Sequence, residues 1–139
     1  MNKPVFVTLA LGAAIAFAGP ACAEKLKATL SGKSEVPATT SSATGTADLD
    51  YDAASKKLAW KVTYSGLSGP ATAAHFHGPA EAGKNAGVAV PIPNAASSPV
   101  EGSATLTDAQ AADLLAGKLY VNIHTAANPG GEIRGQVTK

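Results

Sequence analysis

Three histidines carry the clearest chemical signal in the sequence. His75 and His77 are two residues apart, and His124 ends a separate apolar run at 119–124. Neutral imidazole nitrogens are good ligands for zinc and copper, and three of them leave one position open on the ion. They therefore predict a centre for one divalent copper or zinc ion, provided that the fold brings them together. Such binding is expected to weaken as the pH falls below about 6.5, where free imidazole takes up a proton.

Strand geometry would direct all three imidazoles away from the core. Side chains two apart on a strand share a face, so His75 and His77 leave one face while Phe76 enters the other. In the run 119–124 the apolar residues alternate, which places His124 on the face opposite to them. The sequence leaves open whether these two strands are neighbours, and the metal hypothesis depends on that adjacency.

The next predicted strand, 132–137, follows a short connection and is expected to pair with the strand of His124. Four polar residues of this pair would share the histidine face: Asn122, Glu132, Arg134 and Gln136. We expect Glu132 to be a fourth ligand or an orienting group, with Arg134 as a charge partner. The alternative is a metal-free polar network in which Arg134 pairs with Glu132 and the imidazoles bind Asn122 or backbone carbonyls.

Alternation of apolar and polar residues, the period of a half-buried strand, dominates the remaining chain. It predicts strands at 26–30, 43–51, 58–64, 72–77, 88–92, 102–106, 119–124 and 132–137. Together these predict an all-β domain, an antiparallel Greek-key-like sandwich or barrel of about seven or eight short strands.

One short helix is expected near 108–116. Thr107 is a suitable N-cap, Gln110 would complete a capping box, and Gly117 offers a stop. The residues expected to face the core are Ala111, Leu114 and Leu115.

Residues 1–23 have the features of a cleavable signal peptide: Lys3, an uncharged apolar stretch, and Ala21-Cys22-Ala23 at the cleavage position. We therefore expect a signal peptide at 1–23 and one domain at 24–139 that works in the periplasm or is secreted. Acylation of Cys22 is the alternative, although the Leu-type residue expected before a lipidated cysteine is missing. No later segment is apolar enough to span a membrane.

Charge balance limits the classes of partner. Once Lys3 leaves with the signal peptide, ten basic residues face ten acidic ones, which disfavours nucleic acids and anionic membranes. The expected partners are a metal ion and an extracytoplasmic protein. There is no Ser/His/Asp arrangement and no carboxylate pair on the histidine face, so an enzyme is disfavoured. Redox chemistry at a bound metal stays open.

The stretches HFHGPA at 75–80, YVNIHT at 120–125 and NPGGEIRGQ at 128–136 resemble the CHRD (chordin) domain family. The resemblance runs from about Leu26 to Val137. It implies an extracytoplasmic β module, since the family includes domains of extracellular chordin and single-domain exported microbial proteins. It also implies that the characteristic polar positions are His75, His77, Asn122, His124, Glu132, Arg134 and Gln136. A looser similarity to copper–zinc superoxide dismutases is weakened because the chain lacks histidines for two metals and lacks the cysteine pair.

Overall fold

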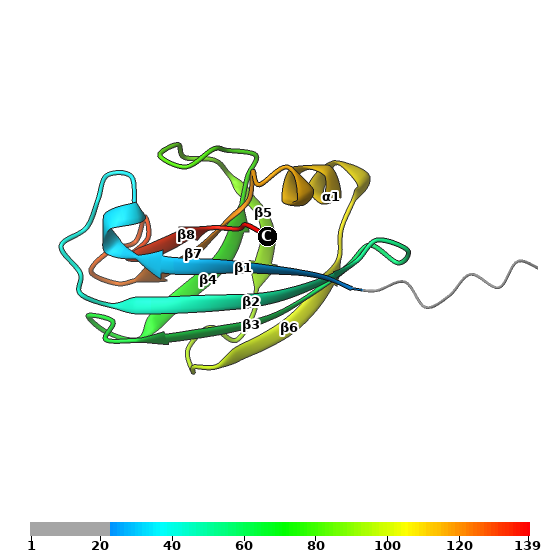
Figure 1. The fold of residues 1–139 in the computed structure, drawn as a ribbon. Helices are drawn as coiled ribbons and strands as arrows, with labels where there is room; N and C mark the ends of the chain where they lie inside the picture. Colours follow the sequence, from blue (N-terminus) through cyan, green and yellow to red (C-terminus); the bar gives the residue numbers. More distant parts are fainter. Residues whose placement is uncertain (1–22) are drawn as a thin grey trace, which may run out of the picture.

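The part of the chain that the structure describes is an all-β domain of eight antiparallel strands in a nearly closed barrel, with one short α-helix (Figure 1). The computed structural model describes residues 23–139, so the predicted signal peptide and Cys22 lie outside it, apart from Ala23. The strands are β1 Glu24–Ser31, β2 Thr44–Asp52, β3 Lys57–Ser65, β4 Ala71–His77, β5 Val88–Ile92, β6 Val100–Thr105, β7 Tyr120–Thr125 and β8 Ile133–Gln136. They follow the order β5-β4-β7-β8-β1-β2-β3-β6. The predicted fold class is confirmed.

The alternating pattern that predicted the strands also fills the barrel. In β1, for example, Leu26, Ala28 and Leu30 are buried while the residues between them are exposed. Across the core, the rings of Trp60 and Phe76 meet edge to face with centroids 5.4 Å apart. A half-buried strand with period two thus places one residue in two in the core, and leaves the others on the outer face.

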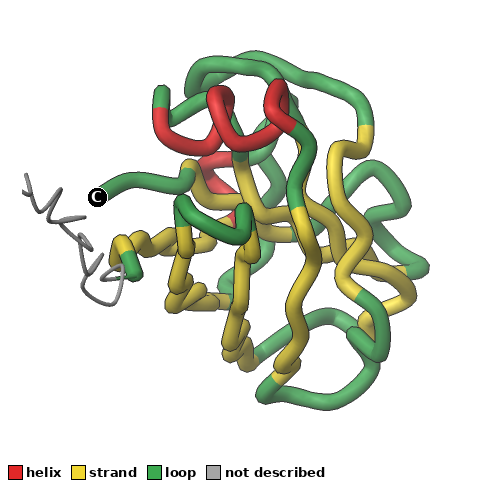
Figure 2. The backbone as a smooth tube through the Cα atoms, turned by 90° about the vertical axis from the view of Figure 1, so that its right-hand side faces the viewer, coloured by secondary structure: helices red, strands yellow, loops and turns green. Residues whose placement is uncertain are grey.

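The helix α1, Asp108–Leu115, begins and ends close to the predicted positions. Thr107 and Gln110 form the expected reciprocal capping box. Ala111 and Leu114 are buried, but the prediction for Leu115 was wrong, because this side chain is 39% exposed. The helix lies across one end of the barrel (Figure 2), and only a narrow stripe of it meets the core.

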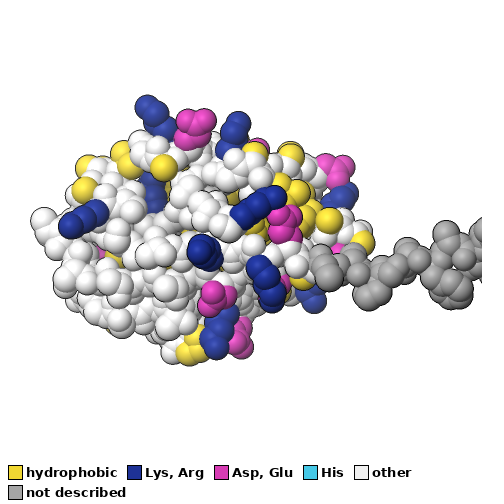
Figure 3. Space-filling view, viewed as in Figure 1, with side chains coloured by type: hydrophobic (Ala, Val, Ile, Leu, Met, Phe, Trp, Pro, Cys, Tyr) yellow, Lys and Arg dark blue, Asp and Glu magenta, His cyan; other side chains and the backbone are white. Residues whose placement is uncertain are grey.

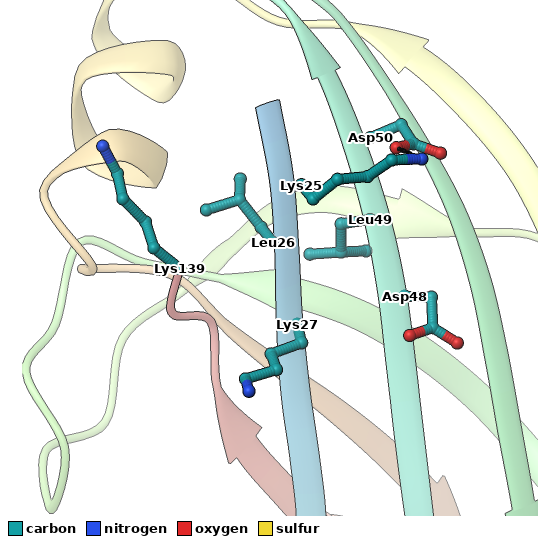
Figure 4. Close-up of a pocket in the computed structure, with 7 residues that line it drawn as sticks. All are labelled: Lys25, Leu26, Lys27, Asp48, Leu49, Asp50 and Lys139. Atoms are coloured by element: carbon teal, nitrogen blue, oxygen red, sulfur yellow. Dashed lines mark ion pairs between the residues drawn. The ribbon is translucent and has the colours of Figure 1, made fainter. Parts of the chain in front are cut away.

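Over the right-hand half of β1 and β2, basic and acidic side chains lie beside one another (Figure 3). A hollow of about 490 Å³ lies there, and the side chain of Lys25 reaches across it to form an ion pair with Asp50 (Figure 4). Its lining residues provide paired charges and no histidine. Within residues 23–139, no helix combines the length and the apolar character that crossing a membrane requires.

Candidate metal centre

The two histidine-bearing strands are neighbours. β4 pairs antiparallel with β7, and the register sets His77 opposite Tyr120, His75 opposite Asn122, and Ala73 opposite His124. Phe76 and Val121 face the core between them, so the three imidazoles lie on the outer face of the barrel. The adjacency on which the metal hypothesis depended is present.

The imidazoles form one compact cluster. The ring centroid of His75 lies 5.3 Å from that of His77 and 5.0 Å from that of His124, and the third separation is 5.8 Å. Each ring offers one nitrogen within 4.8 Å of the nitrogens offered by the other two. His77 and His124 are each only 9% exposed. Ligand nitrogens of a zinc ion lie about 2.0–2.1 Å from it, so small ring movements would close this cluster on one ion.

Backbone carbonyls fix which nitrogen two of the rings present. The Nδ1 atom of His77 lies 3.0 Å from the carbonyl oxygen of Ala86, and the Nδ1 atom of His124 lies 2.9 Å from that of Pro129. A carbonyl oxygen only accepts, so each Nδ1 carries the proton and each Nε2 keeps its lone pair. This is the arrangement that orients histidine ligands in metal sites.

The remaining nitrogens differ in how they are satisfied. The Nε2 atom of His77 is buried and has no hydrogen-bond partner among the described residues. The Nε2 atom of His124 accepts a hydrogen bond from Nδ1 of His75 across 3.1 Å. An ion bound by His124 would replace that hydrogen bond, and it would give the buried Nε2 of His77 the partner that it lacks.

The surroundings of His75 and His77 favour the neutral forms of these two rings. Burial lowers the pKa of His75 from its ordinary value of 6.5, and the neighbouring His124 lowers it further. Burial also lowers the pKa of His77, while its hydrogen bond to Ala86 opposes the change. Neutral rings are the form that binds metal. His75 and His77 therefore take up the proton that would compete with a metal ion at a lower pH than free imidazole does.

Glu132, predicted as a fourth ligand or orienting group, lies outside the imidazole cluster. The strand β8 begins one residue later, and the fully buried carboxylate of Glu132 turns toward hydroxyl-rich loops. It accepts hydrogen bonds from Oγ of Ser41 at 2.7 Å, from N and Oγ of Ser68 at 2.9 and 2.8 Å, and from Oγ1 of Thr125 at 2.6 Å. Burial opposes ionisation, but these hydrogen bonds outweigh it and lower the pKa of Glu132 from 4.5 to about 2.

Arg134 pairs with a different carboxylate from the one expected. Its Nη2 atom lies 3.0 Å and its Nε atom 3.1 Å from Oε2 of Glu35, and both side chains are buried. Asn122 donates a hydrogen bond to Oε1 of Glu35 and lies beside His75 in the β4–β7 register. Sequence reasoning missed Glu35, because it is an isolated acidic residue in a loop and no periodic pattern links it to β7 or β8.

Tyr120 borders the cluster, whereas Gln136 makes its hydrogen bonds elsewhere. The ring of Tyr120 stacks on that of His77, with centroids 5.0 Å apart and planes 5° from parallel. The amide of Gln136, predicted near the ligands, instead donates to the carbonyl oxygens of Ala80 and Gly117, 2.8 Å from each. Gln136 therefore ties down the base of the loop between β4 and β5.

The fold and the cluster together define a small antiparallel β-barrel with a three-histidine candidate metal centre on its outer face. The chain matches the CHRD domain over residues 26–137, nearly the whole described part, and it belongs to that family. No curated protein and no solved structure matches the chain.

Proposed function

We propose that this CHRD domain is a binding module for one divalent metal ion, held by His75, His77 and His124. The observation that carries the proposal is the buried Nε2 atom of His77, which has no hydrogen-bond partner among the described residues. An unsatisfied buried polar atom costs about 1–3 kcal/mol. A metal ion is the partner that fits this atom, since two other imidazoles offer nitrogens within 4.8 Å.

The donor set favours copper or zinc. Three neutral nitrogens suit both ions and leave a fourth position for water or another ligand. Cu²⁺ binds a given nitrogen site more tightly than Zn²⁺ in the usual order of divalent metals, so copper is the ion that we expect to bind more tightly. Glu132 is no longer the preferred fourth ligand, because both of its oxygens already accept hydrogen bonds.

We further propose that the module acts outside the cytoplasm, in the periplasm or as a secreted protein. The proposal rests on the signal-peptide features of residues 1–23. Cysteine thiols tend to be oxidised to disulfides outside the cytoplasm, whereas a site made of histidines alone does not depend on reduced thiols.

The alternative function is a structural or protein-interaction domain with a metal-free polar network. The hydrogen bond between His75 and His124 favours it, because it satisfies two ring nitrogens without an ion. The buried network of Glu35, Asn122 and Arg134 also needs no metal. A folded domain that is indifferent to metals and copurifies with a specific extracytoplasmic protein would support this second function.

Calorimetric titration of the metal-free protein with Cu²⁺ and with Zn²⁺ tests the proposal. One equivalent should bind the wild type, and the affinity should fall sharply in His77→Ala and in a His75→Ala/His124→Ala double variant. At a free-metal concentration of about a hundred times Kd, binding should raise the free energy of unfolding by about 2.7 kcal/mol.

Asp48→Asn is the matched control, since it removes an exposed carboxylate on β2, away from the cluster. This variant should bind metal as the wild type does. Wild-type protein that binds metal no more tightly than the double histidine variant would refute the proposal and leave the metal-free network.

A further inference from the structure

The ring of Tyr120 lies between the guanidinium of Arg134 and the imidazole of His77, a proposed metal ligand. The guanidinium carbon of Arg134 lies 4.1 Å from the centroid of the Tyr120 ring, and the imidazole of His77 stacks parallel to that ring with centroids 5.0 Å apart. Arg134 is on β8 and His77 on β4, the two strands that flank the β7 strand of Tyr120, so the two groups approach the ring from opposite sides. A guanidinium over an aromatic ring is an attractive contact, strongest where both groups are shielded from water. Arg134 and Tyr120 are both buried, so the position of the guanidinium restrains the plane of the His77 ring.

A second route connects the same two residues through the loop between β4 and β5. Arg134 donates from Nη1 to the carbonyl oxygen of Lys84 at 3.2 Å, and from Nη2 to Oδ1 of Asn85 at 2.8 Å. The next residue is Ala86, whose carbonyl oxygen accepts the Nδ1 proton of His77. By holding 84–85, Arg134 places the acceptor that selects the His77 tautomer.

The guanidinium is itself held from the far side. Glu35 accepts from Nε and Nη2 of Arg134, and Asn122 donates to the other oxygen of that carboxylate. The planar fork of an arginine can meet Glu35, the loop and the Tyr120 ring at once, whereas an ammonium is a single point of charge.

From these contacts we propose that Arg134 is a positioning residue for the metal centre: through the Tyr120 stack and through the loop 84–86, it fixes the orientation and the tautomer of His77. The inference rests on the proposed function, because it assigns a role toward the same three-histidine site. Arg134 is not proposed as a ligand, since a protonated guanidinium offers no lone pair to an ion and its N–H groups donate to Glu35, Lys84 and Asn85.

Two variants test the inference. Arg134→Lys keeps a positive charge beside buried Glu35, so the barrel should still fold, but it loses the fork and the flat stacking face. Asn85→Ala, at an exposed loop position, removes the acceptor of Arg134 Nη2 and the hydrogen bond that Asn85 donates to the carbonyl oxygen of Val36. Loss of groups that orient metal-bound histidines typically costs about 10–100-fold in metal affinity. We expect that range for Cu²⁺ binding by Arg134→Lys, and a smaller loss for Asn85→Ala.

The readout specific to positioning is the ring tautomer, measured by ¹⁵N chemical shifts in the metal-free protein above the pKa of the imidazoles. The wild type should show His77 with its proton on Nδ1, and Arg134→Lys should show a mixture of tautomers. His124 is the internal reference, because its Nδ1 atom is held by Pro129 in a different loop and should not change. Thr107→Ala, which removes only the cap of α1, controls for a general loss of stability.

Each outcome separates the hypotheses. Wild-type copper affinity and an unchanged His77 tautomer in Arg134→Lys would overturn the inference while leaving the proposed function intact. Arg134→Lys with mixed tautomers at both His77 and His124 would also overturn the inference, and so would a loss of copper affinity in Thr107→Ala as large as that in Arg134→Lys. Either result would show that the effect comes from a general loss of stability. A wild type that binds no metal refutes the proposed function and, with it, any role of Arg134 toward an ion.

Discussion

Replacement of Glu132 by glutamine separates a structural role from a ligand role for this carboxylate. The carboxylate joins three parts of the chain, since its hydrogen-bond donors are Ser41 in the loop before β2, Ser68 in the loop before β4, and Thr125 at the end of β7. The substitution keeps the shape of the side chain and removes its charge. Glu132→Gln therefore imitates the protonated acid at neutral pH.

The expected loss of stability follows from the pKa. A change from 4.5 in the unfolded chain to about 2 in the fold corresponds to about 3 kcal/mol, at about 1.36 kcal/mol for each pH unit. Because the pKa is lowered on folding, this stabilisation is fully present above 4.5 and is lost as the pH falls from 4.5 toward 2. The free energy of unfolding of Glu132→Gln should thus be lower than that of the wild type by up to about 3 kcal/mol at neutral pH.

Urea unfolding of both proteins at a series of pH values measures this difference, and subtraction of the two curves removes the other titrating groups, which both proteins share. The gap should be constant at neutral pH and should narrow below 4.5. If the two proteins have the same free energy of unfolding, or if their difference does not change with pH, the ionised carboxylate of Glu132 does not hold these three parts of the chain together.

The same variant tests the ligand role. Under conditions in which both proteins are folded, Glu132→Gln should bind Cu²⁺ as tightly as the wild type, because neither oxygen of Glu132 belongs to the imidazole cluster. A loss of affinity as large as that of His77→Ala would show that Glu132 reaches the ion.

Three other predictions follow from the structure. The pKa values of His75 and His77 are lowered on folding, so below 6.5 the unfolded chain binds more protons than the folded one. The free energy of unfolding of the metal-free protein should therefore fall as the pH drops through 6.5, while copper affinity should persist below that pH. A copper affinity that falls with pH as expected for free imidazole would contradict this. Gly131→Ala should destabilise the fold by about 2 kcal/mol or more and weaken copper binding, because a Cβ atom there overlaps Asn122 and Glu35 and the φ angle is +123°. A variant whose midpoint of urea unfolding equals that of the wild type would refute this prediction. Thr107→Ala should cost about 1 kcal/mol, with copper affinity unchanged, since it removes only the helix cap; a weakened site in calorimetry would show unexpected coupling to α1.

Local patterns were sufficient to predict the strands, the helix and the face of each histidine. Period two in β7 places Val121 and Ile123 in the core, and the same count puts His124 outside, whatever the rest of the chain does. The capping box at Thr107 is likewise a contact between residues three apart. Features that depend on neighbours along the chain are accessible to sequence reasoning.

Contacts between distant segments were not accessible in the same way. The pairing of β4 with β7 joins residues that are 47 positions apart at His75 and Asn122, and several other strand orders would satisfy the same alternation. Glu132 shows the related limit at a strand end. Its place in the alternating pattern predicted that Glu132 lies on the same face as the histidines. However, β8 starts only at Ile133, and hydroxyl groups from two remote loops donate hydrogen bonds to the carboxylate.

Strands and loops divide the work of building the candidate centre. The β4–β7 register sets where the three imidazoles stand, but it leaves each ring free to present either nitrogen. The acceptors that remove this freedom are the carbonyl oxygens of Ala86 and Pro129, which belong to two different loops. Fixing the lone pairs before an ion arrives would reduce the ordering cost of binding, so we expect the two loops, as well as the histidines, to set the affinity for any ion bound here.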